Sequence, residues 1–200
     1  MAHINSVEPP AFLKDAKDLL GEHGFATGDT WYHGSSSALV ESIKQQGLKR
    51  SGDKELKAAA KKTMATISHS MGKPIGNEYK ESVEPVFLTQ SKELAFYWAQ
   101  QTVRERNARF NGDEKPVVFA VKLPDALNAQ VKPDVGAASL LLLKEGENFM
   151  AYLAGIYHEN NLGIPEIDLM KADRLEYLHT LGMAYFDADI DATYLEVVTD

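Results

Sequence analysis

Two short stretches carry the residues that could do chemistry. Residues 31–37 read WYHGSSS, so an imidazole and a glycine follow an aromatic pair and precede three hydroxyls. Residues 85–99 read PVFLTQSKELAFYWA, which again joins an apolar run to hydroxyl-bearing residues and a predicted helix start. Two strand ends of this kind could frame one cleft, with His33 and an aromatic side chain on its walls. Such a cleft suits a flat, uncharged heteroaromatic ring, because the ring stacks on the aromatic side chain and Gly34 lets backbone amides approach it.

Each stretch also has a purely structural interpretation. His33 is then an ordinary strand-end histidine before a turn, and Thr89 and Ser91 cap the helix that begins at residue 91. Core packing is the corresponding role of four aromatic residues, Trp31, Tyr32, Trp98 and Phe119. Either stretch alone favours this interpretation, and only their combination favours a ligand cleft.

The usual motifs for phosphate, metal and serine chemistry are missing. The sequence has no Walker pattern, no GxGxxG and no GxSxG elbow. Its six histidines are scattered without HxxxH or HExxH spacing, and residues 187–191 (DADID) lack the glycine and distal glutamate of a calcium loop. We therefore expect no metal site, and we expect residues 189–191 to form a solvated hairpin tip.

Composition and charge favour one soluble domain over residues 1–200. The chain is 44% hydrophobic and 25% charged, which suffices for a domain with its own core. The formal charge of −8 disfavours nucleic acid and anionic membranes as partners. The sequence has no cysteine, no apolar run of membrane-spanning length and no secretory signal pattern. We expect a cytoplasmic protein, or an exported effector without a classical signal peptide.

The strands and helices that must hold the two stretches can be read from apolar spacing. The pattern predicts an N-terminal helix over residues 10–24, then a strand ending in WYH, then a short helix ended by Gly47. Residues 49–84 are rich in Lys, Ser and Gly, and we interpret them as a long insertion with a helix near residues 53–67.

The second half of the chain gives clearer signals. We expect a VFLT strand, a helix started by Ser91, a buried VVFAVKL strand, and a β-rich end with a hairpin across residues 189–191. Two further helices are predicted over residues 146–161 and 165–181. This order of elements indicates an α+β fold rather than a regular βαβ winding.

Over residues 30–125 or so, the sequence resembles an ADP-ribosyltransferase domain, the NAD-consuming fold of mono- and poly-ADP-ribosylating enzymes, rifamycin-modifying transferases and tRNA 2′-phosphotransferases. YHGS at residues 32–35 resembles the Tyr-His-Gly-Thr that ends the family's first strand. VFLTQS with its Ala-rich helix resembles the second motif, and KPVVFAVKLP resembles the next strand. The resemblance implies a split, mixed or antiparallel β core with flanking helices, and NAD bound by Tyr32, His33, Gly34, Ser35, Phe87, Thr89, Ser91 and Tyr97.

The resemblance also implies a role for several of these residues. His33 would hydrogen-bond the ribose hydroxyl beside nicotinamide, and the Gly34 backbone would clamp the carboxamide. Tyr97 falls near the family's helix aromatic that stacks on nicotinamide. Phe87 falls where the family's second strand often has Tyr, so the chain lacks that hydroxyl.

The family's third element is a Glu or Asp on a late strand. It orients the ribose and stabilises the positive charge that develops as nicotinamide leaves. Glu196, in TYLEVV, and Glu166, in IPEIDL, both resemble it. We prefer Glu196, because the periodicity of residues 167–181 puts Glu166 in the first turn of a helix, a common structural position. An exposed edge-strand glutamate that keeps the strand soluble is the structural interpretation of Glu196.

The resemblance therefore predicts an NAD-dependent ADP-ribosyltransferase with His33 and Glu196 or Glu166 as catalytic residues. It would cleave the nicotinamide–ribose bond and pass ADP-ribose to an acceptor that the sequence does not identify, or to water. The acidic charge favours a protein or small-molecule acceptor over nucleic acid, and YLE lacks the ExE or QxE pair of arginine-modifying enzymes. The alternative is a catalytically inactive domain of the same fold, acting as an effector or binding protein; an α+β protein unrelated to NAD is a third hypothesis.

Overall fold

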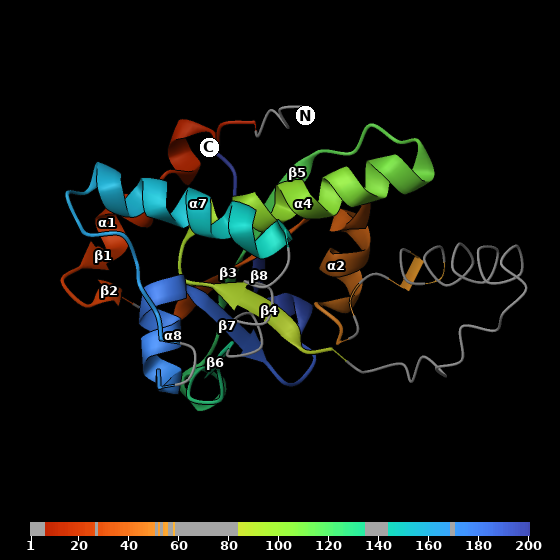
Figure 1. Ribbon diagram of the computed structural model, residues 1–200. Coiled ribbons are helices and arrows are strands. Elements are labelled where there is room, and N and C mark those ends of the chain that lie inside the picture. Colours follow the sequence, from red (N-terminus) through yellow and green to blue (C-terminus); the bar gives the residue numbers. More distant parts are fainter. Residues whose placement is uncertain are drawn as a thin grey trace, which may run out of the picture.

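A six-stranded antiparallel sheet with flanking helices forms the centre of the molecule (Figure 1). The computed structural model describes residues 7–26, 28–50, 52, 54–55, 58, 84–134, 144–168 and 171–200. The strand order across the sheet is β6-β7-β4-β3-β5-β8, and each neighbouring pair is antiparallel. The strands are β3 (Thr30–Ser36), β4 (Val86–Thr89), β5 (Pro116–Lys122), β6 (Lys132–Pro133), β7 (Met183–Phe186) and β8 (Leu195–Val197).

Helices lie on both faces of this sheet. The long helix α4 (Lys92–Phe110) and α7 (Lys144–Glu159) lie together on one side in Figure 1, and α8 (Arg174–Leu181) lies beside the sheet below α7. Leu181 of α8 packs in the cluster with α4 and α7, whereas Leu178 packs in the cluster of the other face. The smaller elements are α1 (Ala16–Leu19), α2 (Val40–Gln46), α5 (Asp125–Asn128), the two-residue strands β1 (Leu20–Gly21) and β2 (Gly24–Phe25), and the 3-10 turns η1 (Ala11–Leu13), η2 (Ser37–Leu39) and η3 (Ala192–Tyr194).

The two neighbours of the central strand β3 pair with it unequally. β3 and β5 are paired over seven residues, from Thr30 opposite Lys122 to Ser36 opposite Pro116. β3 and β4 share one pair, Tyr32 opposite Thr89. The sheet is therefore continuous on the β5 side of β3 and nearly split on its β4 side.

Hydrophobic clusters on the two faces of the sheet fix the helices. Trp31, Phe119 and Leu88 pack on one face against Ile43 of α2 and Leu178 of α8. On the other face, β3 and β5 pack against α4. A third cluster joins α4 to α7, where Tyr97 stacks on Tyr152 at 4.9 Å and Trp98 stacks on Phe149 at 5.2 Å between ring centroids.

Local signals correctly predicted several boundaries. Ser91 caps α4 by accepting a hydrogen bond from the Leu94 amide at 3.0 Å. Gly47 ends α2 with φ +76°, a left-handed conformation that favours glycine. The predicted α+β class and the strands around VFLT and VVFAVKL are also confirmed.

The predicted N-terminal helix over residues 10–24 is wrong. Residues 11–13 form a 3-10 turn, α1 has only four residues, and β1 and β2 then pair with each other. Two packing demands explain the change. Phe25 is fully buried beside Tyr157, and Gly24 has φ +98° with its α-carbon against the backbone of His179, so the chain must turn there.

The predicted helix over residues 165–181 is too long at its start. It begins at Arg174 because Asp173 provides the N-cap, accepting from the Glu176 amide at 2.9 Å. Glu166 therefore does not lie in the first turn of a helix.

The predicted hairpin across residues 189–191 is also wrong. β7 pairs with β4 and β6, whereas β8 pairs with β5 on the other side of the sheet. The acidic residues between them form ion pairs with basic side chains instead: Asp187 pairs with Arg50 at 2.9 Å and Asp189 with Lys49 at 3.2 Å. These ion pairs flank a bridge between Leu48 and Ile190, which ties the segment to the end of α2.

Most of the predicted insertion over residues 49–84, including the helix near residues 53–67, lies outside the described residues. Within the described ranges, no helix combines the length and apolar character needed to cross a membrane.

Candidate functional site

A cavity of about 760 Å³ lies where the sheet is split. Its walls come from β3, β4, one side of α4 and the edge formed by β7 and the residue after β6. Five residues of the predicted NAD site line it: Tyr32, His33, Gly34, Phe87 and Thr89. The tertiary structure thus brings the two stretches that could do chemistry to one cavity.

Gly34 explains how α4 can lie so close to the split. A β-carbon at this position would stand 2.0 Å from the carbonyl oxygen of Ala95 and 2.6 Å from the amide nitrogen of Ala99. Only a residue without a side chain lets the helix backbone approach β3 this closely. Gly34 is therefore required for the wall between β3 and α4, whatever else its backbone contacts.

His33 spans the split with its side chain. Its Nδ1 lies 2.9 Å from the backbone carbonyl oxygen of Phe87 on β4. A carbonyl only accepts, so Nδ1 carries the proton and Nε2 keeps its lone pair. Burial among the surrounding atoms lowers the pKa of His33, and the hydrogen bond to Phe87 opposes this only in part. The imidazole is thus neutral near pH 7, with Nε2 as an acceptor for a hydroxyl.

Two aromatic side chains give the cavity flat walls. Phe87 is 49% exposed although it lies in the middle of the sheet, so its ring faces open space. Trp98 on α4 is half-buried, because its indole stacks on Phe149 and also lines the cavity. Exposed aromatic faces of this kind suit a planar ligand.

Polar side chains enter the cavity from α4 and from the residue after β6. Gln101, Thr102 and Glu105 follow Trp98 at helical spacing and line the same side. Arg104, also exposed, is a cation that has no ion pair within the described part of the chain. Asp134 is buried, with 8% of its surface exposed.

The remaining predicted binding residues lie outside the cavity. Ser35 is buried, and Ser91 is fully buried with its hydroxyl used as the α4 cap. Tyr97 is 7% exposed and belongs to the aromatic cluster between α4 and α7. Thr89 does line the cavity, but its hydroxyl donates to the Ser91 carbonyl at 3.0 Å.

Neither predicted acidic residue lines the cavity. Glu196 is exposed on the edge strand β8, and β5 lies between that strand and β3. None of the lining residues comes from β5 or β8. Glu166 is exposed at a separate cavity of about 270 Å³, beside Gly21 and His23. The strand order, which local patterns do not encode, puts β5 between Glu196 and β3, whereas Glu166 lies outside the sheet at the separate cavity.

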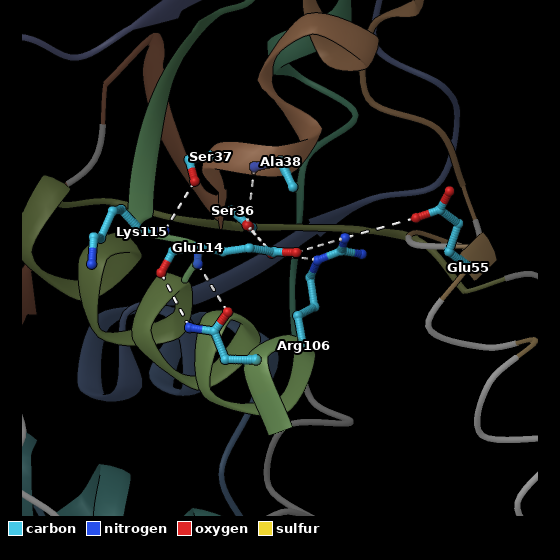
Figure 2. A network of polar contacts seen from close by, with 8 residues as sticks. Ser36, Ser37, Ala38, Glu55, Arg106, Glu114 and Lys115 are labelled. Carbon is cyan, nitrogen blue, oxygen red and sulfur yellow. Dashed lines mark hydrogen bonds and ion pairs between the residues drawn. The ribbon is translucent and has the colours of Figure 1, made fainter. Parts of the chain in front are cut away.

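A cluster of polar residues around Arg106 holds the last residue of β3, Ser36, in place (Figure 2). The Arg106 side chain of α4, 4% exposed, donates to both carboxylate oxygens of Glu114, at 2.6 and 3.0 Å. The Ser36 hydroxyl donates to the same carboxylate. Asn107 holds the backbone of Glu114 through two hydrogen bonds, at 2.9 and 3.2 Å.

This cluster lowers the pKa of the Glu114 carboxyl, chiefly through the hydrogen bond from Arg106. The charge of Glu114 is thus used to tie α4 to the loop before β5 and to the end of β3. Glu114 therefore has a structural role, on the side of β3 that lies away from the split.

Sequence reasoning missed Trp98, Arg104 and Asp134 as cavity residues. The helical spacing of Trp98, Gln101 and Glu105 is a signal that could have revealed the α4 wall. No local signal points to Asp134, a single acid after a proline. Within the described ranges, no three His, Asp or Glu side chains gather closely enough to hold a metal ion.

Comparison of the chain with protein-family models, curated proteins and solved structures gives no match.

Proposed function

We propose that this chain is an NAD-dependent ADP-ribosyltransferase that binds NAD⁺ in the cavity at the split. One observation supports this above all. Five of the residues that the family resemblance assigns to NAD line a single cavity, although the two stretches that supply them are about fifty residues apart. The acceptor is a protein or a small molecule, or water.

The size and chemistry of the cavity fit this ligand. A volume of about 760 Å³ lies within the range of ordinary cofactor sites. Phe87 and Trp98 offer faces for planar rings, and Nε2 of neutral His33 can accept from a ribose hydroxyl. Arg104 can bind a pyrophosphate oxygen at the cavity rim, since a guanidinium pairs well with phosphate.

The reaction would break the bond between the ribose anomeric carbon and the nicotinamide nitrogen, with the electron pair leaving on nicotinamide. The acceptor oxygen or nitrogen then bonds to the anomeric carbon and loses its proton to a base. Holding the ribose with His33 and the ring against an aromatic wall favours this geometry over free solution. Positive charge grows at the anomeric carbon, so a nearby carboxylate would lower the barrier.

A second candidate function is NAD⁺ binding without catalysis, as in an inactive effector of the same fold. The position of the glutamates favours it, because Glu196 and Glu166 both lie away from the cavity. Phe87 also lacks a hydroxyl that a tyrosine would supply.

Incubation with NAD⁺ and detection of free nicotinamide by mass spectrometry tests the proposal, with NAD⁺-induced thermal stabilisation as the binding assay. Release together with stabilisation supports the transferase, and stabilisation without release supports the binding protein. Neither release nor stabilisation would exclude both. Tyr97→Phe is a control variant, because Tyr97 packs in the core between α4 and α7 and does not line the cavity.

A further inference from the structure

A row of three side chains crosses the sheet from the cavity to the β6 edge. Phe87 of β4 lies directly opposite Tyr185 of β7, and Tyr185 lies directly opposite Lys132 of β6. Residues directly opposed in an antiparallel sheet project from the same face, with their β-carbons about 5 Å apart. Phe87 lines the cavity, whereas Tyr185 and Lys132 do not. These three residues, the aromatic row, therefore continue the ring surface of the cavity onto the next two strands.

The aromatic row is open to solvent, although β4 and β7 are interior strands of the sheet. Phe87 is 49% exposed, Tyr185 is half-buried and Lys132 is exposed. The alternate residues of β4, Val86 and Leu88, are buried in the cluster of the other face. Neighbouring rings that a sheet leaves uncovered on one face are typical of a binding surface rather than of a core.

Lys132 gives the aromatic row a positive end. Its ammonium lies 5.8 Å from the centre of the Tyr185 ring, and within the described part of the chain it has no ion pair. The nearby acids do not compete at the surface, because Asp134 is 8% exposed and Asp187, after β7, is paired with Arg50 at 2.9 Å. A ligand on the aromatic row therefore meets an exposed ammonium beside two rings. An ammonium of this kind attracts a phosphate or a carboxylate.

We propose that the aromatic row is the acceptor subsite, and that the acceptor is a small molecule with a planar aromatic ring and a phosphate or carboxylate group. The acceptor ring packs against Tyr185, and its anionic group pairs with Lys132. Phe87 then lies between the nucleotide in the cavity and the acceptor. This assignment rests on the proposed function and adds no step to the proposed reaction.

The length of the aromatic row and its charge both favour a small anion over a protein acceptor. At the usual strand spacing, the row from β4 to β6 measures roughly 10 Å, which is the length of one substituted ring. A stable protein interface buries about 800 Å² on each partner, far more than three side chains offer. The exposed positive charge also disfavours a basic acceptor such as an arginine side chain.

NMR titration of the ¹⁵N-labelled protein with three probes tests the subsite. Phenyl phosphate carries both the ring and the anion, phenol carries the ring alone, and inorganic phosphate carries the anion alone. We expect the wild type to bind phenyl phosphate at least about tenfold more tightly than phenol or inorganic phosphate. Lys132→Gln should weaken phenyl phosphate binding by about fivefold or more and leave phenol binding within about twofold. Lys122→Gln, the same change at an exposed lysine of β5, should keep the wild-type affinities.

Tyr185→Leu tests the recognition of the ring, because leucine keeps an apolar side chain without an aromatic face. Phenyl phosphate binding should weaken by about fivefold, with inorganic phosphate binding within about twofold of the wild type. Circular dichroism checks that the variants fold. If Tyr185→Leu does not fold, the preference of the wild type for phenyl phosphate over cyclohexyl phosphate decides the ring recognition without any variant.

A second phenyl phosphate titration, with saturating NAD⁺ present, separates the acceptor subsite from the nucleotide site. Unchanged affinity supports a subsite beside NAD⁺, whereas competition would show that NAD⁺ itself occupies the aromatic row and would overturn the inference. Equal affinities for the three probes, or unchanged phenyl phosphate binding in Lys132→Gln, would overturn it too, while NAD⁺ binding stands. If NAD⁺ does not bind but phenyl phosphate binds as expected, the proposed function fails and the aromatic row remains a site for an aromatic anion.

Discussion

The strand β3 is held in different ways along its two sides. Toward β5 it has seven backbone pairs, and its end is tied through Ser36 to the buried ion pair of Arg106 and Glu114. Toward β4 it has one backbone pair and a hydrogen bond from the His33 ring. Backbone pairing and the ion pair of Arg106 with Glu114 hold the β5 side of β3, whereas the β4 side of β3 borders the cavity.

Together with the proposed function, the difference predicts that stability and ligand binding depend on opposite sides of one strand. On the β5 side, the buried guanidinium of Arg106 and the half-buried carboxylate of Glu114 are bound to each other. On the β4 side, Phe87 is half exposed, and Nδ1 of His33 is bound to the Phe87 carbonyl, which leaves Nε2 as an acceptor. Substitutions on the β5 side should mainly change the free energy of unfolding, and those on the β4 side should mainly change binding.

The largest expected effect is at the buried ion pair. Glu114→Ala should lower the free energy of unfolding by about 4 kcal/mol, because the buried guanidinium of Arg106 loses its two short hydrogen bonds to a carboxylate and keeps the longer ion pair with Glu55, at 3.8 Å. Urea denaturation measures this loss. Asp113→Asn, at the exposed neighbouring acid, should change stability by less than about 0.5 kcal/mol. A loss below about 1 kcal/mol in Glu114→Ala would contradict the structural role of the cluster.

The next effect is at the contact between β3 and α4. Gly34→Ala should cost about 3 kcal/mol, because the new β-carbon would meet helix backbone at 2.0 Å and α4 would have to move. Thermal unfolding followed by circular dichroism measures the change. Gly28→Ala is the control, since a β-carbon there meets nothing within 4 Å. Equal melting temperatures for the two variants would show that α4 does not need glycine at residue 34.

On the β4 side, binding should change more than stability. Phe87→Ala should weaken NAD⁺ binding by about tenfold or more, because the planar ring of the bound nucleotide loses an aromatic side chain on which to stack. The same change should cost less than about 1 kcal/mol of stability, since the side chain is half exposed. Calorimetric titration and urea denaturation of one preparation give both values. A large stability loss with unchanged affinity would reverse the comparison between the two sides.

The smallest effect concerns the pH dependence of stability. The folded-state pKa of His33 is lowered from 6.5, so the folded protein resists protonation more than the unfolded chain does. The His33 contribution is therefore present above pH 6.5 and is lost as pH falls through the lower folded pKa.

Urea denaturation across this range should show the wild type losing stability more steeply than His33→Gln, by at most about 1.4 kcal/mol per pH unit. Parallel curves would mean that His33 is not desolvated at the split. Glu114→Gln serves as the contrast. Its removal should change the slope below pH 4.5, because the Glu114 pKa is lowered and its contribution is lost in acid.

The sequence was a good guide wherever the cause is local. A serine before an amphipathic run marks the start of α4, and a glycine after one marks the end of α2. The alternation and the apolar runs predicted β3, β4 and β5. The predicted end of the first strand at His33 is wrong, because β3 stays paired with β5 as far as Ser36, and His33 and Gly34 lie within the strand. Side-chain capping and turn chemistry act within a few residues, so a sequence pattern carries them.

Only the tertiary structure decided which distant residues share the cavity. β7 and β8 are close in sequence, but β7 lies beyond β4 in the strand order and β8 lies at the opposite edge, beyond β5. This order places Glu196 away from the split between β3 and β4. Asp134 and Met183 are about fifty residues apart, and the pairing of β6 with β7 brings them together. Strand partners are chosen by burial of whole faces against helices, a property of the entire chain rather than of any short stretch.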